Sequence, residues 1–459
     1  MLDPIGSVPD AELSAELAAE TQAPTEQVRT AATTPKRPSL WGHADYRKLW
    51  SAATVSLMGT QVSQLAIPYI AAIVLGASVF QVALLGTVEM LPFILFTLPA
   101  GAWLDRVRRR PVLIAGDLGR AAALTSIPLA YAAGVLSIWQ LYAVGFITGL
   151  LTVLFDVADQ SYLPVILDAD DLVEGNAKLQ VSAAAAQFVG PGLAGGILAA
   201  VAAPFAIIID AASFVVSGSF IALIRKHEPK PERKRAADGT HTSLPTEIAE
   251  GLRYVLGNRY LRMIAASTGT SNLGSSLLFS ILAVFVYREL GLSPLVVGLS
   301  GACAGGGLLL GAMISAPLAR RFGVGPVIIG SMFMSGLAAF PIVFLPSQPI
   351  LAGVLLGSSS FALSAAAVVY NVNQVSFRQA ITPLDMQGRM NATMRFIVWG
   401  VMPIGSVLGG LLGSVLPLRL TILLGAILSS TAFVWVLASP VRSLRDIPKA
   451  SRSDAVASD

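Results

Sequence analysis

Hydrophobic residues in this chain form long stretches without a charge, and polar residues gather in short segments between them. Residues 49–88, 179–209 and 322–377 contain no Asp, Glu, Lys or Arg. About 20 apolar residues cross a bilayer as a helix, so the longest stretch is long enough for two crossings. Each stretch is apolar all round, whereas spanning barrel strands alternate apolar and polar positions over about ten residues. The pattern therefore predicts helices that span a membrane.

Glycine, proline and polar residues divide these stretches into segments of helix length. The segments fall into two groups of six, which predicts an all-α integral membrane protein with twelve transmembrane helices in two pseudo-symmetric six-helix halves. The predicted helices cover residues 50–75, 82–104, 111–134, 138–160, 177–201, 204–224, 260–287, 295–319, 325–345, 350–373, 390–415 and 418–438.

The polar segments predict how the chain is organised around these helices. The first segment is rich in Ala, Thr, Pro and Glu and lacks the charged start, apolar core and cleavage site of a secretory signal. The segment between the halves is rich in Lys, Arg and Pro, which favours a solvated linker, with a short surface helix near residues 245–256. We expect a disordered cytoplasmic tail over residues 1–40, a six-helix bundle over 41–224, a cytoplasmic linker over 225–258, a second bundle over 259–439 and a cytoplasmic tail over 440–459.

Composition and charge support the same interpretation. Hydrophobic residues make up 54% of the 459 residues and charged residues 13%, with a mean hydropathy of +0.70, and a water-soluble globule could not bury so much apolar surface. The formal charge is +4, and most Lys and Arg residues fall on one side of the predicted bundle, with Arg288 and Arg419 on the other. Because cytoplasmic loops are enriched in Lys and Arg, we expect both termini to be cytoplasmic, in a plasma (inner) membrane. The charge thus reflects topology and does not indicate a nucleic-acid partner.

A short basic turn, Gly101-Ala-Trp-Leu-Asp105-Arg106-Val-Arg-Arg-Arg110, joins the second and third predicted helices. A weaker copy returns in the second half, with Arg320 in the place of the acid. A carboxylate at such a helix end can accept from the N-terminus of a helix in the other half, or pair with an arginine, and so stabilise a closed cytoplasmic gate. The alternative is that the basic residues only fix the topology. The predicted gate consists of Gly101, Asp105, Arg106, Arg109 and Arg110.

Charged residues inside the predicted helices form a candidate network. Asp117 and Arg120 lie three residues apart on one face of the third helix, where we expect them to compensate each other. Asp156 and Asp159, near the end of the fourth helix, approach the same surface. A paired charge within a membrane is satisfied, so a packing role for Asp117 and Arg120 is favoured over a role in the mechanism.

Glu89 and Asp210 have no cation in their own predicted helices. A carboxyl group in such a position suits a site that binds and releases a proton as water reaches it. We therefore predict that Glu89 and Asp210 couple a flow of protons or other cations to the activity of the protein. The alternative is that each makes a hydrogen bond between helices.

Polar side chains on the first and seventh predicted helices are candidates for lining a central cavity: Gln61, Gln64 and Asn272. Such side chains also hold helices together by hydrogen bonds, so both interpretations stay open. The remaining predicted midplane consists mostly of Ala, Val, Leu, Phe, Met and Ser, which favours a large amphipathic solute.

The sequence argues against several kinds of chemistry. Cys303 is the only cysteine, and His43, His227 and His241 lie outside the predicted helices without the spacing of metal ligands. No Gly-Lys dipeptide occurs, so a phosphate-binding loop for ATP is absent. We expect no metal, cofactor, ATP or nucleic acid, and no enzymatic activity, because the predicted helices offer no metal site or nucleophile with a base.

Together these motifs resemble the major facilitator superfamily over about residues 40–440. The basic turn resembles the superfamily's loop between helices 2 and 3, and Gly190-Pro191-Gly-Leu-Ala-Gly195-Gly196 resembles the fifth-helix motif of its antiporters. Three further stretches resemble the branch of macrolide-efflux and enterobactin-exporter proteins: residues 117–120, 155–164 and 387–395.

The resemblance implies a secondary transporter that works by alternating access, with one half rocking against the other. It implies proton-coupled efflux of a small amphipathic compound, such as a drug, an antibiotic or a siderophore, by a monomer. Three alternatives stay open: an importer of the same fold, which needs a dedicated polar site; an ion channel, which needs a continuous polar pore; and a membrane-embedded enzyme.

Overall fold

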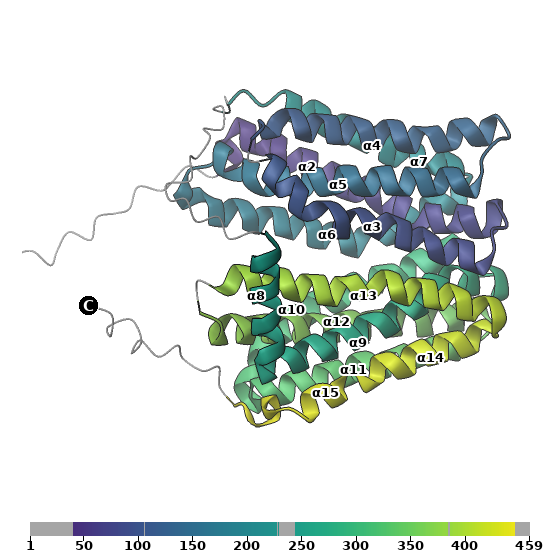
Figure 1. Cartoon of the computed structure of the whole chain (residues 1–459). Helices are drawn as coiled ribbons and strands as arrows, with labels where there is room; N and C mark the ends of the chain where they lie inside the picture. Colours follow the sequence, from purple (N-terminus) through teal and green to yellow (C-terminus); the bar gives the residue numbers. More distant parts are fainter. Residues whose placement is uncertain (1–39, 105, 227, 229–243, 384–385, 446–459) are drawn as a thin grey trace, which may run out of the picture. The chain divides into compact units, whose positions relative to one another are not determined.

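The computed structural model describes residues 40–104, 106–226, 228, 244–383 and 386–445 (Figure 1). The chain divides into two compact units, Met1–His43 and Ala44–Asp459. In the first unit the described residues form one 3-10 turn, η1 (Leu40–Gly42), closed by a hydrogen bond from the His43 amide to the Leu40 carbonyl. All other described elements belong to the second unit.

The described residues of the second unit include twelve helical segments that are long and apolar enough to cross a membrane. The first half contains α2 (Ala44–Tyr69) with the π-helical turn η2 (Ile70–Val74), α3 (Val79–Leu104), α4 (Arg109–Ala132), α5 (Ile138–Ile166), η3 (Ala169–Asp171), α6 (Leu172–Ala200) and α7 (Ala203–Ala222). The second half contains α9 (Arg259–Val284) with the π-helical turn η4 (Phe285–Glu289), α10 (Pro294–Phe322), α11 (Val324–Val343), α12 (Pro349–Ile381), α13 (Gln387–Val415), α14 (Leu418–Thr431), α15 (Phe433–Leu437) and η6 (Pro440–Ser443). The predicted fold class, an all-α membrane protein with two six-helix halves, is confirmed.

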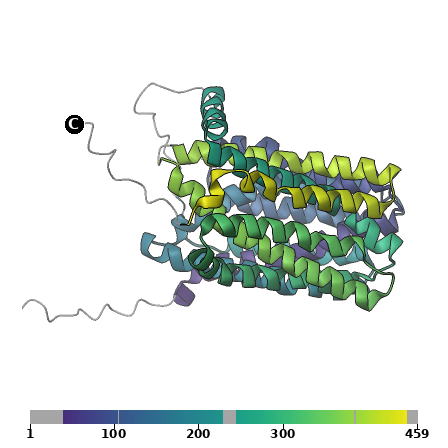
Figure 2. The same ribbon diagram turned by 90° about the horizontal axis from the view of Figure 1, so that it is seen from below.

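Helices of each half pack mainly on one another, and two helix pairs make most of the contacts between the halves. In the first half α2 and α4 pack on α7, and in the second half α10 and α11 pack on α12. The joining pairs are α6 with α10 and α3 with α13. Figures 1 and 2 show the long helices of this unit running side by side, the purple and blue ones of the first half beside the green and yellow ones of the second. The short helix α8 (Leu244–Gly257) instead runs across them, beside α13.

Local sequence signals explain where several helices begin and end. The Asn258 side chain accepts hydrogen bonds from the backbone amides of Tyr260 and Leu261, which caps the start of α9. Ser293 caps α10 in the same way. Gly323, between α10 and α11, has a φ of 89°, a conformation that only glycine adopts without strain, so the chain turns there within one residue.

Two helices continue more than five residues past their predicted ends. The fourth predicted helix was expected to end near residue 160, but α5 continues to Ile166. The tenth was expected to end near residue 373, but α12 continues to Ile381. The polar residues of this last segment suggested a helix end, yet they stay helical because their side chains find partners in the protein. Asn373, for example, donates to Ser315 Oγ on α10 at 3.0 Å.

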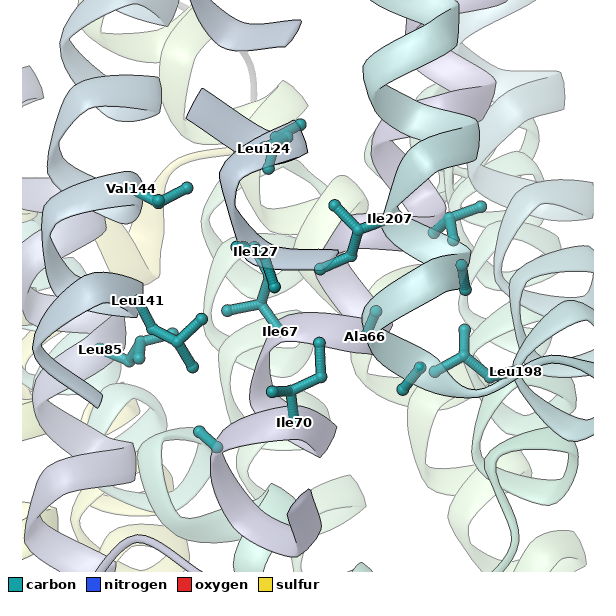
Figure 3. Packing of buried hydrophobic residues seen from close by; sticks show 14 of the residues in the cluster. Ala66, Ile67, Ile70, Leu85, Leu124, Ile127, Leu141, Val144, Leu198 and Ile207 are labelled. Carbon is teal, nitrogen blue, oxygen red and sulfur yellow. The ribbon is translucent and has the colours of Figure 1, made fainter. Parts of the chain in front are cut away.

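Three clusters of buried apolar side chains hold the unit together. The first lies mostly in the first half, where Ile67, Ile127 and Ile207 from three helices pack together (Figure 3). A second cluster joins Ala83 of α3 to residues of the second half, and a third includes Val255 of α8. Lipid tails are as apolar as these side chains, so close packing stabilises the helix contacts more than exclusion from water does.

Candidate functional site

The two ends of the helix bundle differ in charge. One end carries Lys48, Arg109, Arg110, Lys226 and Arg321, and we call it the basic end. At the other end, which we call the opposite end, α2 leads into η2 and α9 leads into η4. The candidate site is described from the opposite end toward the basic end.

At the opposite end, α2 and α9 finish with the same local structure. Each ends in a π-helical turn closed by a hydrogen bond from a leucine amide, Leu75 to the Ile70 carbonyl and Leu290 to the Phe285 carbonyl. Each leucine is followed by a glycine with positive φ, 59° at Gly76 and 63° at Gly291. The sequences Leu-Gly-Ala-Ser and Leu-Gly-Leu-Ser mark this repeat, which the sequence analysis missed.

These two turns bind one another and join the halves. Arg288 of η4 donates from Nε to the carbonyl oxygen of Ala72 at 2.6 Å and from Nη2 to that of Ala77 at 2.6 Å. The rings of Tyr69 and Tyr287 stack edge to face with centroids 4.9 Å apart. A guanidinium bound to carbonyl groups at a helix C-terminus is favoured by the helix dipole, so this contact stabilises closure of the opposite end.

Glycines bring the helices that join the halves close together near the opposite end. A Cβ atom on Gly195 of α6 would lie 2.6 Å from the carbonyl oxygen of Pro294, and one on Gly298 of α10 would lie 2.8 Å from the Cα of Gly195. A Cβ on Gly410 of α13 would lie 2.8 Å from the Cβ of Ala83 on α3. Both helix pairs therefore cross at van der Waals distance in the part of the bundle near the opposite end.

The residues of the predicted fifth-helix motif take different places in this contact. Gly195 and Pro191 face α10, where a Cβ on Gly301 would approach the Pro191 ring to 3.1 Å. Gly190 instead faces α2 and packs against the Gln61 side chain. A Cβ atom added at Gly196 would have no other atom within 4 Å. The motif thus serves close helix packing at three of its four named positions.

Two cavities lie nearer the basic end. The larger, of about 720 Å³, is enclosed by α9 to α13 of the second half. The smaller, of about 260 Å³, lies between α3 and α5 of the first half and α13 of the second. Arg395 and Trp399 of α13 line both. The larger cavity thus lies within the second half and the smaller one between the halves, while a further cavity of about 300 Å³ lies between α3, α9 and α13 nearer the opposite end.

The predicted cavity-lining residues fare differently. Asn272 lines the larger cavity, and its amide donates to the Val398 carbonyl at 2.9 Å. Gln61 packs on Gly190, as described above, and Gln64 is exposed on α2.

A buried cluster of charges occupies the first half. Arg120 Nη2 lies 2.6 Å from Asp117 Oδ1, and neither side chain is more than slightly exposed. The guanidinium also lies over the rings of Phe155 and Phe214, 4.3 and 4.2 Å from their centroids. Asp117 Oδ2 is buried and has no hydrogen-bond partner among the described residues. The sequence placed Asp117 and Arg120 on one helix face, and the structure makes them an ion pair.

Three further carboxyl groups share this one guanidinium. Asp156 and Asp210 lie within electrostatic reach of Arg120, and Asp159 interacts with both Asp156 and Asp117. Asp210 is 1% exposed, and its Oδ1 accepts from Ser213 Oγ at 3.2 Å. Asp156 lines the smaller cavity, so the cluster reaches the space between the halves.

Glu89 lies apart from this cluster, on the face of α3 that packs against α5. A Cβ on Gly145 would lie 3.0 Å from the Glu89 Cγ and 3.6 Å from its Oε1, so this glycine makes room for the side chain. No hydrogen bond or ion pair joins the Glu89 side chain to another residue in the described part of the chain. It is a partly buried acid without a cation.

The basic turn is bound within its own half. Glu228 accepts from the backbone amides of Arg109 at 2.7 Å and Arg110 at 3.1 Å, and it forms an ion pair of 3.5 Å with the Arg109 guanidinium. Arg110 donates to the carbonyl groups of Ile221 and Ala222 at the end of α7. These bonds fix the start of α4 to the end of α7 and to the start of the linker.

Other parts of the predicted gate are less constrained. Gly101 has nothing within 4 Å of an added Cβ, and the Arg106 side chain is exposed. Asp105 lies outside the described residues. The predicted role of this turn as a gate stays a prediction.

Several residues of the site escaped the sequence analysis. Arg378 and Arg395 line the larger cavity, and neither was among the predicted cavity-lining residues. Arg288 had been considered only for the distribution of charge across the membrane. The scarcity of acids in the second half could have indicated these arginines. Between residues 259 and 438 only Glu289 and Asp385 are acidic, so most arginines inside these helices have no acid of the same half to pair with.

The described residues contain no group of three or more His, Cys, Asp and Glu that could hold a metal ion. The polar groups of the site are therefore amides, hydroxyls, arginines and dispersed acids. This set can bind a solute by hydrogen bonds and charge and can exchange protons.

Comparison with known proteins identifies the family. A family model described as a transmembrane secretion effector matches residues 39–457. The multidrug efflux pump Tap of Mycolicibacterium fortuitum is 27% identical over 387 residues, which are 81% of this chain and 88% of Tap. Among solved structures, a bacterial homologue of the iron transporter ferroportin in an inward-facing state matches with a TM-score of 0.68 at 18% identity, over 87% of this chain and 99% of the homologue. A variant of the nucleoside transporter NupG matches with a TM-score of 0.70 at 13% identity, over 86% and 99%.

These matches extend over most of both chains, and the solved structures share the fold of the twelve helices described above. A carrier of this kind is not an enzyme. The chain belongs to the transmembrane secretion effector family of the major facilitator superfamily and is a multi-pass membrane transporter.

Proposed function

We propose that this transporter exports a small amphipathic compound, such as a drug, an antibiotic or a siderophore, in exchange for protons that enter the cell. It acts as a monomer by alternating access, without ATP. Its basic end and both termini face the cytoplasm of a plasma (inner) membrane, as the distribution of Lys and Arg indicates.

The uneven contact between the halves is the observation that carries this proposal. Arg288, the tyrosine pair and the glycine crossings join the halves at the opposite end, while the two cavities lined by Arg395 lie toward the basic end. A carrier that alternates between two faces needs a state of this kind, with one end closed and a solute site that opens to the other. With the basic end cytoplasmic, this is the state that takes up a solute from inside the cell.

The acids of the first half support coupling to protons. Four carboxyl groups, those of Asp117, Asp156, Asp159 and Asp210, share the guanidinium of Arg120. Ionised carboxylates in one low-dielectric cluster repel one another, so protons bound there neutralise it. Glu89, which has no cation partner in the described chain, is the second candidate for carrying a proton.

The basic turn supplies the gate of the other state in this proposal. Arg109 and Arg110 are already bound within the first half, whereas Arg106 is exposed. When the halves close at the basic end, Asp105 and Arg106 reach the second half and hold it there. The name of Tap, a multidrug efflux pump, supports the outward direction and the amphipathic class of solute.

The available energy is sufficient. One elementary charge moving through 100 mV releases about 2.3 kcal/mol, and about 1.4 kcal/mol changes a concentration ratio tenfold. One proton per cycle can therefore drive more than tenfold accumulation of a neutral solute.

The test is proton flux in inside-out vesicles with an acidic lumen. Addition of a transported compound from a chemically varied panel should release protons from the lumen of wild-type vesicles, because solute enters as protons leave. Glu89→Gln should abolish that proton release and keep exchange of labelled for unlabelled solute. Asp210→Asn should behave in the same way, and Glu174→Gln, at an exposed acid on α6, is the matched control.

Two results would contradict the proposal. Normal proton-driven accumulation by Glu89→Gln would show that Glu89 does not couple. Uptake of a solute by intact cells, with none accumulated by inside-out vesicles, would establish the importer instead.

A further inference from the structure

The second half contains a cavity whose charge is entirely positive among its described wall residues. It measures about 720 Å³, within the range of small-molecule sites. Arg378 of α12 and Arg395 of α13 line it, together with amide and hydroxyl groups such as those of Asn272 and Tyr370. None of the wall residues found in the described chain is Asp or Glu.

The rest of the second half offers these arginines no counter-ion. Its only acids in sequence are Glu289 and Asp385. Glu289 lies at the opposite end and pairs with Arg419 at 3.3 Å, and Asp385 lies outside the described residues. On the linker side, Glu250 of α8 pairs with Arg389 at 2.9 Å. Glu289 and Glu250, the acids whose contacts are described in and beside this half, therefore each already have an arginine.

Arg378 forms no ion pair with a described acid, and one of its nitrogens has no hydrogen-bond partner. That nitrogen is Nε, which is buried and bonds to no group in the described chain, and the same holds for Oε1 of Gln374, one helical turn before it. Gln374 itself is 4% exposed, and its amide nitrogen donates to Asn371 Oδ1 at 3.0 Å. A buried polar atom without a partner is costly, so an arginine Nε left without an acceptor inside a membrane protein indicates a ligand that supplies one.

Arg395 is held in a different way. Its guanidinium carbon lies 4.7 Å from the centroid of the Trp399 ring, and both side chains line the two cavities. Stacking on an aromatic ring orients the guanidinium and leaves its N–H groups free to bind an anion. Asp156 also lines the smaller cavity, and no ion pair joins it to Arg395 in the described chain.

The apolar part of the wall suits a planar or branched hydrophobic body. Leu308, Met332, Met394 and Val398 line the cavity beside Trp399. Methionine side chains adapt to different shapes, and tryptophan offers a flat surface for stacking. The cavity therefore combines two cationic groups with an adaptable apolar wall.

We propose that this cavity is the solute site and that it selects an amphipathic organic anion, with Arg378 and Arg395 binding the carboxylate or a similar acidic group. Arginine binds carboxylates with paired N–H donors, a geometry that neutral and cationic compounds cannot use. This inference rests on the proposed function, because the solute bound here is the compound that the carrier exports.

Equilibrium dialysis with the purified full-length protein tests the inference through three probes that share one ring system. The probes are 1-naphthoate, which is anionic, 1-naphthamide, which is neutral, and 1-naphthylmethylamine, which is cationic at neutral pH. The wild type should bind the naphthoate about tenfold or more tightly than the amide, the difference expected for hydrogen bonds to a charged group. The amine should bind more weakly than the amide.

Variants locate the effect. Arg378→Gln and Arg395→Gln should each reduce the preference for naphthoate over naphthamide by about tenfold while binding of the amide stays within about twofold. Arg320→Gln, which removes an exposed arginine at the end of α10, should leave the preference unchanged. Arg378→Lys keeps the positive charge and should keep part of the preference, which separates loss of charge from misfolding.

Three results would overturn the inference: equal binding of the three probes, preference for the amine, or an undiminished preference in both glutamine variants. The result of the vesicle assay does not depend on the result of these binding measurements. An anion preference without proton-driven flux would contradict the proposed coupling and keep the site, whereas proton-driven export of cations by a protein without anion preference would remove the site and keep the function.

Discussion

Arg288, in the second half, donates a hydrogen bond from Nε to the carbonyl oxygen of Ala72, in the first half, over 2.6 Å. A second donor of the same guanidinium reaches Ala77. Both acceptors are main-chain atoms, so the contact depends on the position of the backbone and on one side chain only. This side chain is therefore the natural place to weaken the closure of the opposite end.

Arg288→Gln should increase the fraction of molecules that are open at the opposite end. A hydrogen bond to a charged group contributes about 1.5–3 kcal/mol, which corresponds to about tenfold or more in a population ratio. The measurement is labelling of a cysteine at Ser335, in the wall of the larger cavity, by a membrane-impermeant maleimide on intact cells, in a Cys303→Ser background.

Arg419→Gln is the control for this experiment. Arg419 lies at the same end but binds Glu289 and the carbonyl groups of Val343 and Leu345, all in its own half. Equal labelling of the two variants would mean that Arg288 does not hold the halves together.

Gly195→Ala should destabilise this state, and Gly196→Ala should not. The new Cβ at Gly195 would meet backbone atoms of α10, beginning with the Pro294 carbonyl oxygen at 2.6 Å, and overpacking of this kind costs about 1–3 kcal/mol. The new Cβ at Gly196 meets nothing within 4 Å, and alanine is the better helix former. The measurement is the melting temperature of each purified variant in detergent. An equal decrease in the melting temperature of both variants would show that α6 and α10 do not meet at Gly195.

Single substitutions in the Asp117–Arg120 pair should be more harmful than the double substitution. Removing one member of a buried ion pair costs about 3–5 kcal/mol because the other charge is left uncompensated, whereas replacing both costs less. Unfolding of Asp117→Asn, Arg120→Gln and the double variant forms a double-mutant cycle, with Glu174→Gln of an exposed pair as reference. Purely additive effects would indicate that the two groups do not interact.

The orientation in the membrane can be tested with two cysteines in the Cys303→Ser background. Val135→Cys lies in the exposed connection between α4 and α5 at the opposite end, and Ser443→Cys lies in η6 at the basic end. In intact cells an impermeant reagent should label the first and reach the second only after permeabilisation, as Lys and Arg enrichment predicts. The reverse pattern would place the basic end outside the cell.

The helices could be predicted from sequence because charge-free stretches of sufficient length have few other possibilities in lipid. The ends were harder to place. Asn371, Asn373 and Gln374 look like the end of a membrane helix, yet α12 continues past them since they face protein and a cavity. Hydropathy reports the environment that a side chain prefers on average and does not distinguish a polar interior from an aqueous surface.

The site was only partly predictable, and the reason is geometric. Asp117 and Arg120 share one helix, so their spacing of three residues indicated the pair. The contact of Arg288 with Ala72 and the position of Arg378 in the wall of the larger cavity depend on which helices become neighbours. A sequence read one helix at a time does not contain that information.

The matched π-helical turns at the ends of α2 and α9 have the same backbone but differ at the position of Arg288. Aligning Leu75 with Leu290 places Ile73 at the position of Arg288, and Ile73 is 40% exposed. One copy of the turn therefore supplies the donor and the other supplies the acceptors. The internal symmetry of the carrier is broken at the side chain that binds its two halves together.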